Sequence, residues 1–99
     1  MLRHWGYLKM VRSNRISIAM ATYNGAQFLP EQLESFLSQS RLPDELVVCD
    51  DGSSDNTMNI LHEFSASVPF EVRIEQNVEN LGYVRNFEKA LSLCTGDLV

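Results

Sequence analysis

The sequence has little of what marks disulfide-stabilised, membrane-spanning or nucleic-acid-binding proteins. Its 99 residues include two cysteines, Cys49 and Cys94, whose spacing fits neither a disulfide framework nor a metal knuckle. No apolar run approaches the ~18 residues of a membrane-spanning helix. Four of its eight basic residues precede Ile16, which leaves four bases against all thirteen acids in the remainder. Because such a body repels phosphate backbones, we expect no nucleic acid partner. The pattern of the two cysteines favours a reduced, cytoplasmic compartment.

The first fifteen residues differ from the rest of the chain. Apolar residues recur there at helical spacing (Leu2, Trp5, Leu8 and Val11) among basic ones, which is typical of a short helix on an anionic membrane surface. Segments that precede the first strand of a domain are also commonly poorly ordered. We favour a poorly ordered extension over residues 1–15, and a peripheral position at the inner face of the membrane is the alternative that the helix would allow.

From Ile16 onward, strand patterns alternate with helical patterns. Strands are predicted at 16–21, 46–49 and 70–75, and apolar residues recur at helical spacing within 29–37, 58–64 and 84–94. Strand, helix, strand connections of this length imply right-handed parallel crossovers. The second strand is apolar throughout, as in a strand buried on both faces, whereas the third alternates apolar and charged residues, as at a sheet edge.

The fold class that follows is α/β, a Rossmann-like and mostly parallel sheet with helices on both faces. Residues 16–99 form this domain, and Asp97 begins what we expect to be a fourth strand, within which the domain is truncated.

Two carboxylates end the apolar strand in the stretch Glu-Leu-Val-Val-Cys-Asp-Asp-Gly-Ser-Ser-Asp, residues 45–55. Asp50 and Asp51 should therefore lie at the carboxyl edge of the sheet, where open α/β sheets bind ligands. Gly52 suits the tight turn that follows, and one of the next three residues (Ser53, Ser54 or Asp55) should cap the next helix. The other interpretation is that the two carboxylates only accept backbone N–H groups of the turn.

Three turns, at residues 21–24, 50–52 and 77–86, should converge on this edge. They offer what a pyrimidine base needs: an aromatic face on Tyr23, an acceptor such as Asp51 for the imide N–H of the ring, and donors from Arg85 or Asn86 for its carbonyls. Neither Gly-x-x-x-x-Gly-Lys-Ser/Thr nor Gly-x-Gly-x-x-Gly occurs, which argues against P-loop and dinucleotide-binding proteins.

Four motifs follow one another between Ile16 and Val99. They are Ile-Ala-Met-Ala-Thr-Tyr-Asn-Gly, Glu-Leu-Val-Val-Cys-Asp-Asp-Gly-Ser-Ser-Asp-Asn-Thr, Asn-Leu-Gly-Tyr-Val-Arg-Asn-Phe and Thr-Gly-Asp. In order and spacing they resemble the N-terminal half of family 2 glycosyltransferases of GT-A fold, especially rhamnosyltransferase-like bacterial members. The resemblance implies transfer of a sugar from a UDP- or dTDP-sugar to an acceptor hydroxyl on a saccharide or lipid-linked molecule, with inversion, in cell-surface polysaccharide synthesis.

By the same resemblance, the first turn lines the base pocket, Asp51 contacts the base and Asp50 supports the turn. The nucleotide-binding residues that it implies are Ala21, Thr22, Tyr23, Asn24, Asp50, Asp51, Gly52, Gly82, Arg85 and Asn86.

Two elements of the family pattern do not occur in the sequence. Family members hold a divalent metal, Mg or Mn, through an Asp-x-Asp motif, and a later carboxylate serves as general base. Asp97 cannot replace the motif, since it lies at the amino end of its predicted strand, on the opposite edge. We therefore expect a nucleotide-binding half-site with no catalytic residue and no metal ligand, which is inactive alone.

Other protein classes were compared with this pattern. A haloacid dehalogenase-like phosphatase matches through Asp51-Gly52-Ser53, but Cys49 would then occupy the position of its nucleophile. A receiver-type signalling domain carries its paired acids after the first strand, whereas here they follow the second. A non-catalytic nucleotide-binding or interaction module stays open, since an unfinished sheet exposes a strand for self-association. The donor base stays open among uracil, thymine and guanine.

Overall fold

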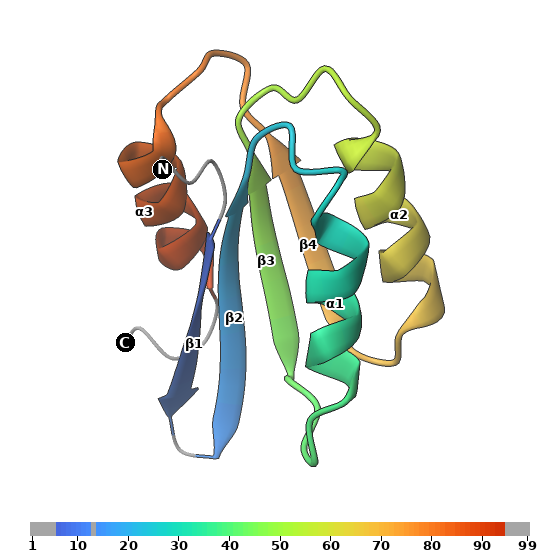
Figure 1. Ribbon diagram of the computed structural model, residues 1–99. Helices are drawn as coiled ribbons and strands as arrows, with labels where there is room; N and C mark the ends of the chain where they lie inside the picture. The colour runs from blue at the N-terminus through green and yellow to red at the C-terminus, as the bar shows by residue number, and fades with distance from the viewer. Residues whose placement is uncertain (1–5, 13, 95–99) are drawn as a thin grey trace.

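The structure, a computed structural model, describes residues 6–12 and 14–94. A single four-stranded sheet lies between helices (Figure 1). In chain order the elements are β1 (Gly6–Arg12), β2 (Arg15–Thr22), α1 (Leu29–Leu37), β3 (Glu45–Asp50), α2 (Thr57–Ser67), β4 (Glu71–Gln76) and α3 (Tyr83–Leu93). The strand order is β1-β2-β3-β4, with β2, β3 and β4 parallel and β1 antiparallel to β2.

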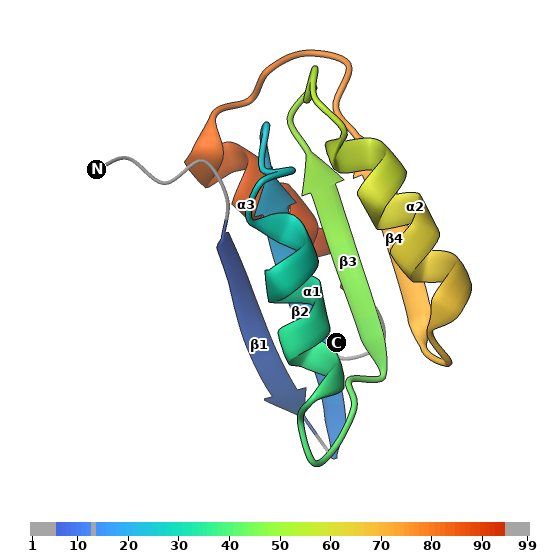
Figure 2. The ribbon, with the colours of Figure 1, turned by 45° about the vertical axis from the view of Figure 1, so that its right-hand side comes forward.

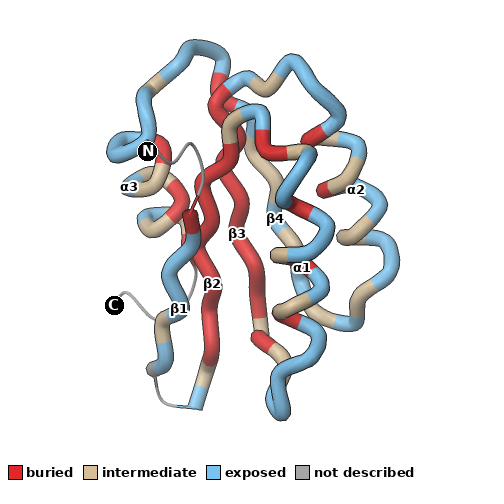
Figure 3. The backbone as a smooth tube through the Cα atoms, in the orientation of Figure 1, coloured by how far each residue is buried: buried red, intermediate tan, exposed pale blue. Residues whose placement is uncertain are grey.

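Helices cover both faces of the sheet. Helices α1 and α2 lie side by side on one face, and α3 lies on the other (Figure 2). Because side chains alternate along a strand, β2 and β3 each feed two cores. The core under α1 and α2 contains Ile18, Met20, Leu29, Leu33, Phe36, Leu46, Val48 and Leu61. The core under α3 contains the smaller residues Ala19, Val47, Cys49, Ala90 and Cys94. Both central strands are consequently buried along almost their whole length (Figure 3).

The predicted alternation of strands and helices from Ile16 onward is confirmed, and with it the α/β fold class. The apolar strand β3 is buried at every residue. Strand β4 has only exposed and half-buried residues and ends the described sheet, as its alternating sequence predicts. The predicted fourth parallel strand, from Asp97, lies outside the described residues. None of the helices described is long and apolar enough to cross a membrane.

Residues 6–12 differ from the expected helix or poorly ordered extension, because they form the edge strand β1. Its Cα partners run from Gly6 with Ala21 to Arg12 with Arg15, and Asn14 in the connecting turn has a positive φ of 67°. The two faces of β1 bind opposite sides of the domain: Met10 packs against the core under α3, and Tyr7 meets Phe36 edge to face at 5.0 Å between ring centroids. Leu8 and Val11, two of the residues at helical spacing, are exposed, and pairing with β2 makes this segment a strand. The domain boundary at residue 16 stays a prediction.

Candidate functional site

The predicted convergence of three turns at one edge of the sheet occurs in the structure. Thr22, Asp50 and Gln76 end the three parallel strands and are aligned in register. The loops that follow them lie together at one end of the molecule (Figure 1). Direct bonds join these loops: the Asn24 backbone N–H donates to Ser53 Oγ at 2.7 Å, and the Asn77 backbone N–H donates to the Asp50 carbonyl at 2.8 Å. We call this edge, with its three loops, the rim.

Asp50 is fully buried and serves the rim as an internal support. Its Oδ1 accepts hydrogen bonds from the hydroxyls of Thr22 (2.7 Å) and Ser53 (2.6 Å). Its Oδ2 accepts the backbone N–H of Ser53 at 2.8 Å and that of Gly52 at 3.2 Å, together with the Gln76 amide at 3.2 Å. All lone pairs of the carboxylate are thereby used. Asp50 cannot contact a ligand and instead fixes the turn after β3.

Asp51 is bound from the opposite loop, with 6% of its surface exposed. Its Oδ1 accepts the backbone N–H of Leu81 at 2.7 Å and the amide of Asn77 at 2.9 Å, and its Oδ2 accepts the backbone N–H of Gly82 at 3.0 Å. Burial alone raises the pKa of Asp51, but these hydrogen bonds outweigh burial and hold the pKa below its usual value. The group is therefore a carboxylate at neutral pH. Oδ1 accepts two of these bonds and Oδ2 accepts one, and the Asn80 amide, which donates to the backbone carbonyl of Asp51, also lowers the pKa of the carboxyl group.

The Asn86 side chain lies inside the domain. It is 1% exposed, and its amide donates to the carbonyl of Cys49 at 2.9 Å and, at 3.5 Å, to that of Thr22. Its Oδ1 accepts the Asn77 amide at 2.7 Å. These bonds attach α3 to the ends of β2 and β3. Because the Asn86 amide donates to two backbone carbonyls, it has no free N–H group for the predicted hydrogen bond to a base carbonyl.

Other predicted residues do face solvent. Tyr23 is half-buried, and Asn24 is exposed at a positive φ of 50°. Arg85 is exposed on the first turn of α3 and forms no ion pair within residues 6–12 and 14–94. The rim therefore presents an aromatic ring and a guanidinium around a nearly buried carboxylate. By position, the predicted residues that a ligand could reach are Tyr23, Asn24, Gly52, Gly82 and Arg85, with Asp51 at the margin, while Ala21, Thr22, Asp50 and Asn86 are buried.

Three further polar residues shape the rim, although none of them was predicted as a nucleotide-binding residue. Ser53 bridges two of the loops, Asn77 contacts Asp51, and Asp55 joins the start of α1 to the start of α2. Asp55 accepts the backbone N–H groups of Ala26 at 3.1 Å and Thr57 at 3.0 Å. Of the three expected caps for α2, Asp55 thus comes nearest to that role, although Asn56 holds the N-cap position. Asn77 could have been predicted as a residue of the rim, because it directly follows a strand.

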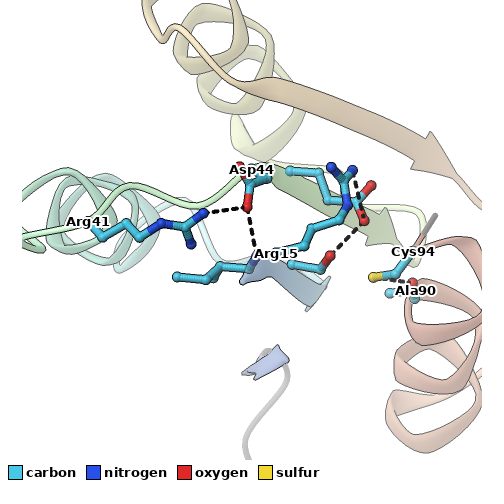
Figure 4. A network of polar contacts seen from close by, with 8 residues as sticks. Arg15, Arg41, Asp44, Ala90 and Cys94 are labelled. Carbon is cyan, nitrogen blue, oxygen red and sulfur yellow. Dashed lines mark hydrogen bonds and ion pairs between the residues drawn. The ribbon is translucent and has the colours of Figure 1, made fainter. Parts of the chain in front are cut away.

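The opposite end of the sheet holds a second polar cluster, whose role is structural. The Asp44 carboxylate accepts the Ile16 backbone N–H at 2.7 Å and an Arg41 guanidinium N–H at 3.1 Å, while Ser17 donates to Glu45 at 2.7 Å (Figure 4). These bonds lower the pKa of Asp44, with the Ile16 N–H as the largest cause. The cluster secures the start of β2 against the chain that enters β3.

Neither metal ligands nor a large pocket marks another site. No three side chains of His, Cys, Asp and Glu gather in the part of the chain that the structure describes, so the residues present do not fit a divalent metal centre. A mostly apolar groove lies between α1 and α2, lined by Leu33, Leu37, Ile60 and Phe64 together with Pro30, Glu34 and Ser38. The convergence of charge, hydrogen bonding and exposed backbone favours the rim over this groove.

The fold and the rim define an α/β domain whose polar loops gather at the carboxyl ends of three parallel strands. Residues 17–99 match the family described as Glycosyl transferase family 2, and the chain belongs to this family. The resemblance seen in the four motifs is thereby confirmed.

Several relatives carry the names of glycosyltransferases. The chain is 35% identical over 85 residues to the protein named glycosyltransferase EpsE of Bacillus subtilis (strain 168), covering 86% of this chain and 31% of EpsE. It is 41% identical over 63 residues to dTDP-rhamnosyl transferase RfbG of Shigella flexneri, 64% of this chain and 22% of RfbG. Chondroitin synthase of Escherichia coli is 36% identical over 81 residues, 82% of this chain and 12% of that protein. The chain therefore spans less than a third of the length of these relatives. No solved structure matches the chain.

Proposed function

We propose that this chain forms the nucleotide-binding half of a glycosyltransferase that uses a UDP- or dTDP-sugar. The family supports the reaction class, and the relative named dTDP-rhamnosyl transferase supports such a donor. The observation that carries the proposal is the ionised Asp51 carboxylate, whose Oδ2 accepts only one of the three hydrogen bonds from the neighbouring loop. A carboxylate in this state can only accept a hydrogen bond.

The chemistry of Asp51 favours a base with an imide N–H. Uracil and thymine present this donor between two carbonyls, whereas cytosine presents a lone pair at the same position and would face the carboxylate with like charge density. We assign the half-buried Tyr23 of the neighbouring loop to stacking on the ring, and the exposed Arg85 to a carbonyl or to the diphosphate. The small exposed part of Asp51 suits one contact with the edge of a base.

In the complete reaction, an acceptor hydroxyl on a saccharide or lipid-linked molecule displaces the nucleoside diphosphate from the anomeric carbon, with inversion. A divalent metal on the diphosphate and a carboxylate that removes the hydroxyl proton belong to this chemistry. We assign both to residues outside this chain and derive no step through them here, since no metal donor set gathers among the residues described. We propose that the chain alone binds without turnover and that the whole protein acts in the cytoplasm, at the inner face of the membrane, in cell-surface polysaccharide synthesis.

The proposal is tested by amide NMR of the labelled chain titrated with UDP, dTDP and GDP, each with and without magnesium. We expect metal-independent shifts at residues 21–24, 50–52 and 81–86 with the first two nucleotides. If GDP binds most strongly, the donor is a GDP-sugar and not a UDP- or dTDP-sugar. A dispersed spectrum that responds to none of the three would refute nucleotide binding and favour a non-catalytic interaction module.

A further inference from the structure

Lys89 carries a half-buried ammonium group toward the interior of the rim. Its Nζ donates to the Asn77 side-chain oxygen, Oδ1, at 2.8 Å from the middle of α3. Within the described ranges it pairs with no carboxylate, so its charge is directed at a neutral amide. The sequence contains one other lysine, Lys9, which is exposed on β1.

The contact fixes the orientation of the Asn77 amide. An ammonium group can donate but not accept, so the oxygen of Asn77 must face Lys89. The NH2 group then faces two acceptors, Asp51 Oδ1 at 2.9 Å and Asn86 Oδ1 at 2.7 Å. With the amide turned over, its oxygen would face the Asp51 carboxylate and its NH2 group would face the ammonium. Both contacts are repulsive, so Lys89 and the Asp51 carboxylate favour the same one of the two orientations.

Burial makes this selection consequential for Asp51. The Asn77 side chain is 7% exposed, so water cannot readily replace a lost partner. Asn77 supplies one of the three hydrogen bonds that hold the carboxylate. If its amide turned over or lost its order, the carboxylate would move away from the repulsive oxygen, and its Oδ2 would change position.

We propose that Lys89 is a positioning residue of the base site, which acts through Asn77 to hold the Asp51 carboxylate where the imide N–H of a base meets it. The inference rests on the proposed function of Asp51. It concerns base discrimination, since Lys89 itself would touch no part of the nucleotide.

The test compares UDP with its N3-methyl analogue, which lacks the imide N–H. Dissociation constants are measured by calorimetry for the wild type, Lys89→Met and Lys9→Met, two variants that remove the same charge. The wild type should prefer UDP by about 10-fold to 100-fold, the usual value of a hydrogen bond to a charged group. Lys89→Met should lower this preference at least about fivefold and leave the affinity for the N3-methyl analogue within about twofold. Lys9→Met should keep the wild-type preference.

Two further variants separate positioning from folding. Lys89→Arg retains a cationic donor and should restore most of the preference. Asn77→Ala removes the side chain through which Lys89 acts on Asp51, so it should lower the preference for UDP as Lys89→Met does. The double variant should lose no more of this preference than Asn77→Ala alone. If Lys89→Met does not give a folded amide spectrum, the proposal is judged by the preference of Asn77→Ala for UDP over the N3-methyl analogue, and an unchanged preference would overturn it.

The outcomes distinguish the two proposals. A wild type that does not distinguish UDP from its N3-methyl analogue refutes the role of Asp51. A wild type that distinguishes them, with the preference unchanged in Lys89→Met, overturns the role of Lys89 alone. Equal losses for both nucleotides in Lys89→Met would also overturn it, because a purely structural role predicts that result.

Discussion

Replacing Asp51 by asparagine tests how the rim is held together. The carboxylate accepts three hydrogen bonds: Asn77 and Leu81 donate to Oδ1, and Gly82 donates to Oδ2. An amide of the same shape keeps one acceptor oxygen. With that oxygen toward Asn77 and Leu81, its NH2 group faces the Gly82 N–H, which loses its acceptor.

The expected cost follows from these bonds. Loss of a hydrogen bond to a charged group, here the bond from Gly82, costs about 1.5–3 kcal/mol. The two retained hydrogen bonds also weaken, because the acceptor loses its charge. We expect Asp51→Asn to lower the free energy of unfolding by about 2–4 kcal/mol at pH 7. This is a large fraction of the total free energy of unfolding of a small domain, about 5–15 kcal/mol.

The pH dependence gives a second check on the same variant. The pKa of Asp51 is lowered in the folded chain, so its ionisation stabilises the fold above the pKa of the unfolded state, near 3.9. That contribution declines as the pH falls through this value toward the folded pKa. The difference between wild type and Asp51→Asn should therefore shrink below pH ~4.

Urea unfolding at several pH values between 7 and 3 measures both effects. Glu63→Gln, on the exposed face of α2, removes the same charge and should change stability little. No loss for Asp51→Asn at pH 7, or a loss that does not vary with pH, would refute the reasoning.

Three other predictions concern the rim and the sheet edge. Gly82 has φ 85° and ψ 162°, a region nearly reserved for glycine, so Gly82→Ala should lower the free energy of unfolding by about 1–3 kcal/mol in urea titrations, and an unchanged midpoint would contradict this. Arg85→Gln should weaken UDP binding several-fold, with a smaller salt dependence in calorimetry, while leaving stability unchanged; equal salt dependence would exclude a diphosphate contact. Removing residues 1–12 uncovers the pairing edge of β2 and should cause self-association in analytical ultracentrifugation, whereas a monomer at the same concentration would count against it.

The sequence predicts the architecture well because β2 and β3 carry their information locally. In an α/β chain, an apolar run such as Leu46 to Cys49 usually forms a strand buried on both faces. The polar residues after it then lie at the carboxyl edge of the sheet. The same logic failed at the N-terminus. The spacing of Leu8 and Val11 fits a helix. The segment is a strand because it pairs with β2, and this contact cannot be inferred from local spacing.

The candidate site was predictable in position but less so in detail. Motifs identify Asp51 and Asn86, but they do not show which way a side chain points. Asn86 turns inward to the Cys49 carbonyl, and the backbone N–H groups that hold Asp51 come from a loop thirty residues away in the chain. Such contacts depend on tertiary structure, as does the approach of Lys89 to Asn77.

The central claim is that Asp51 accepts the imide N–H of a bound base. The most direct measurement is an NMR spectrum of 15N-labelled UDP bound to the unlabelled chain, which reports on the imide proton. We predict a signal shifted downfield and protected from exchange with water, with cross-relaxation to the Leu81 and Gly82 amide protons, and its loss in Asp51→Asn. Bound UDP whose imide proton exchanges as fast as in free solution would contradict the account.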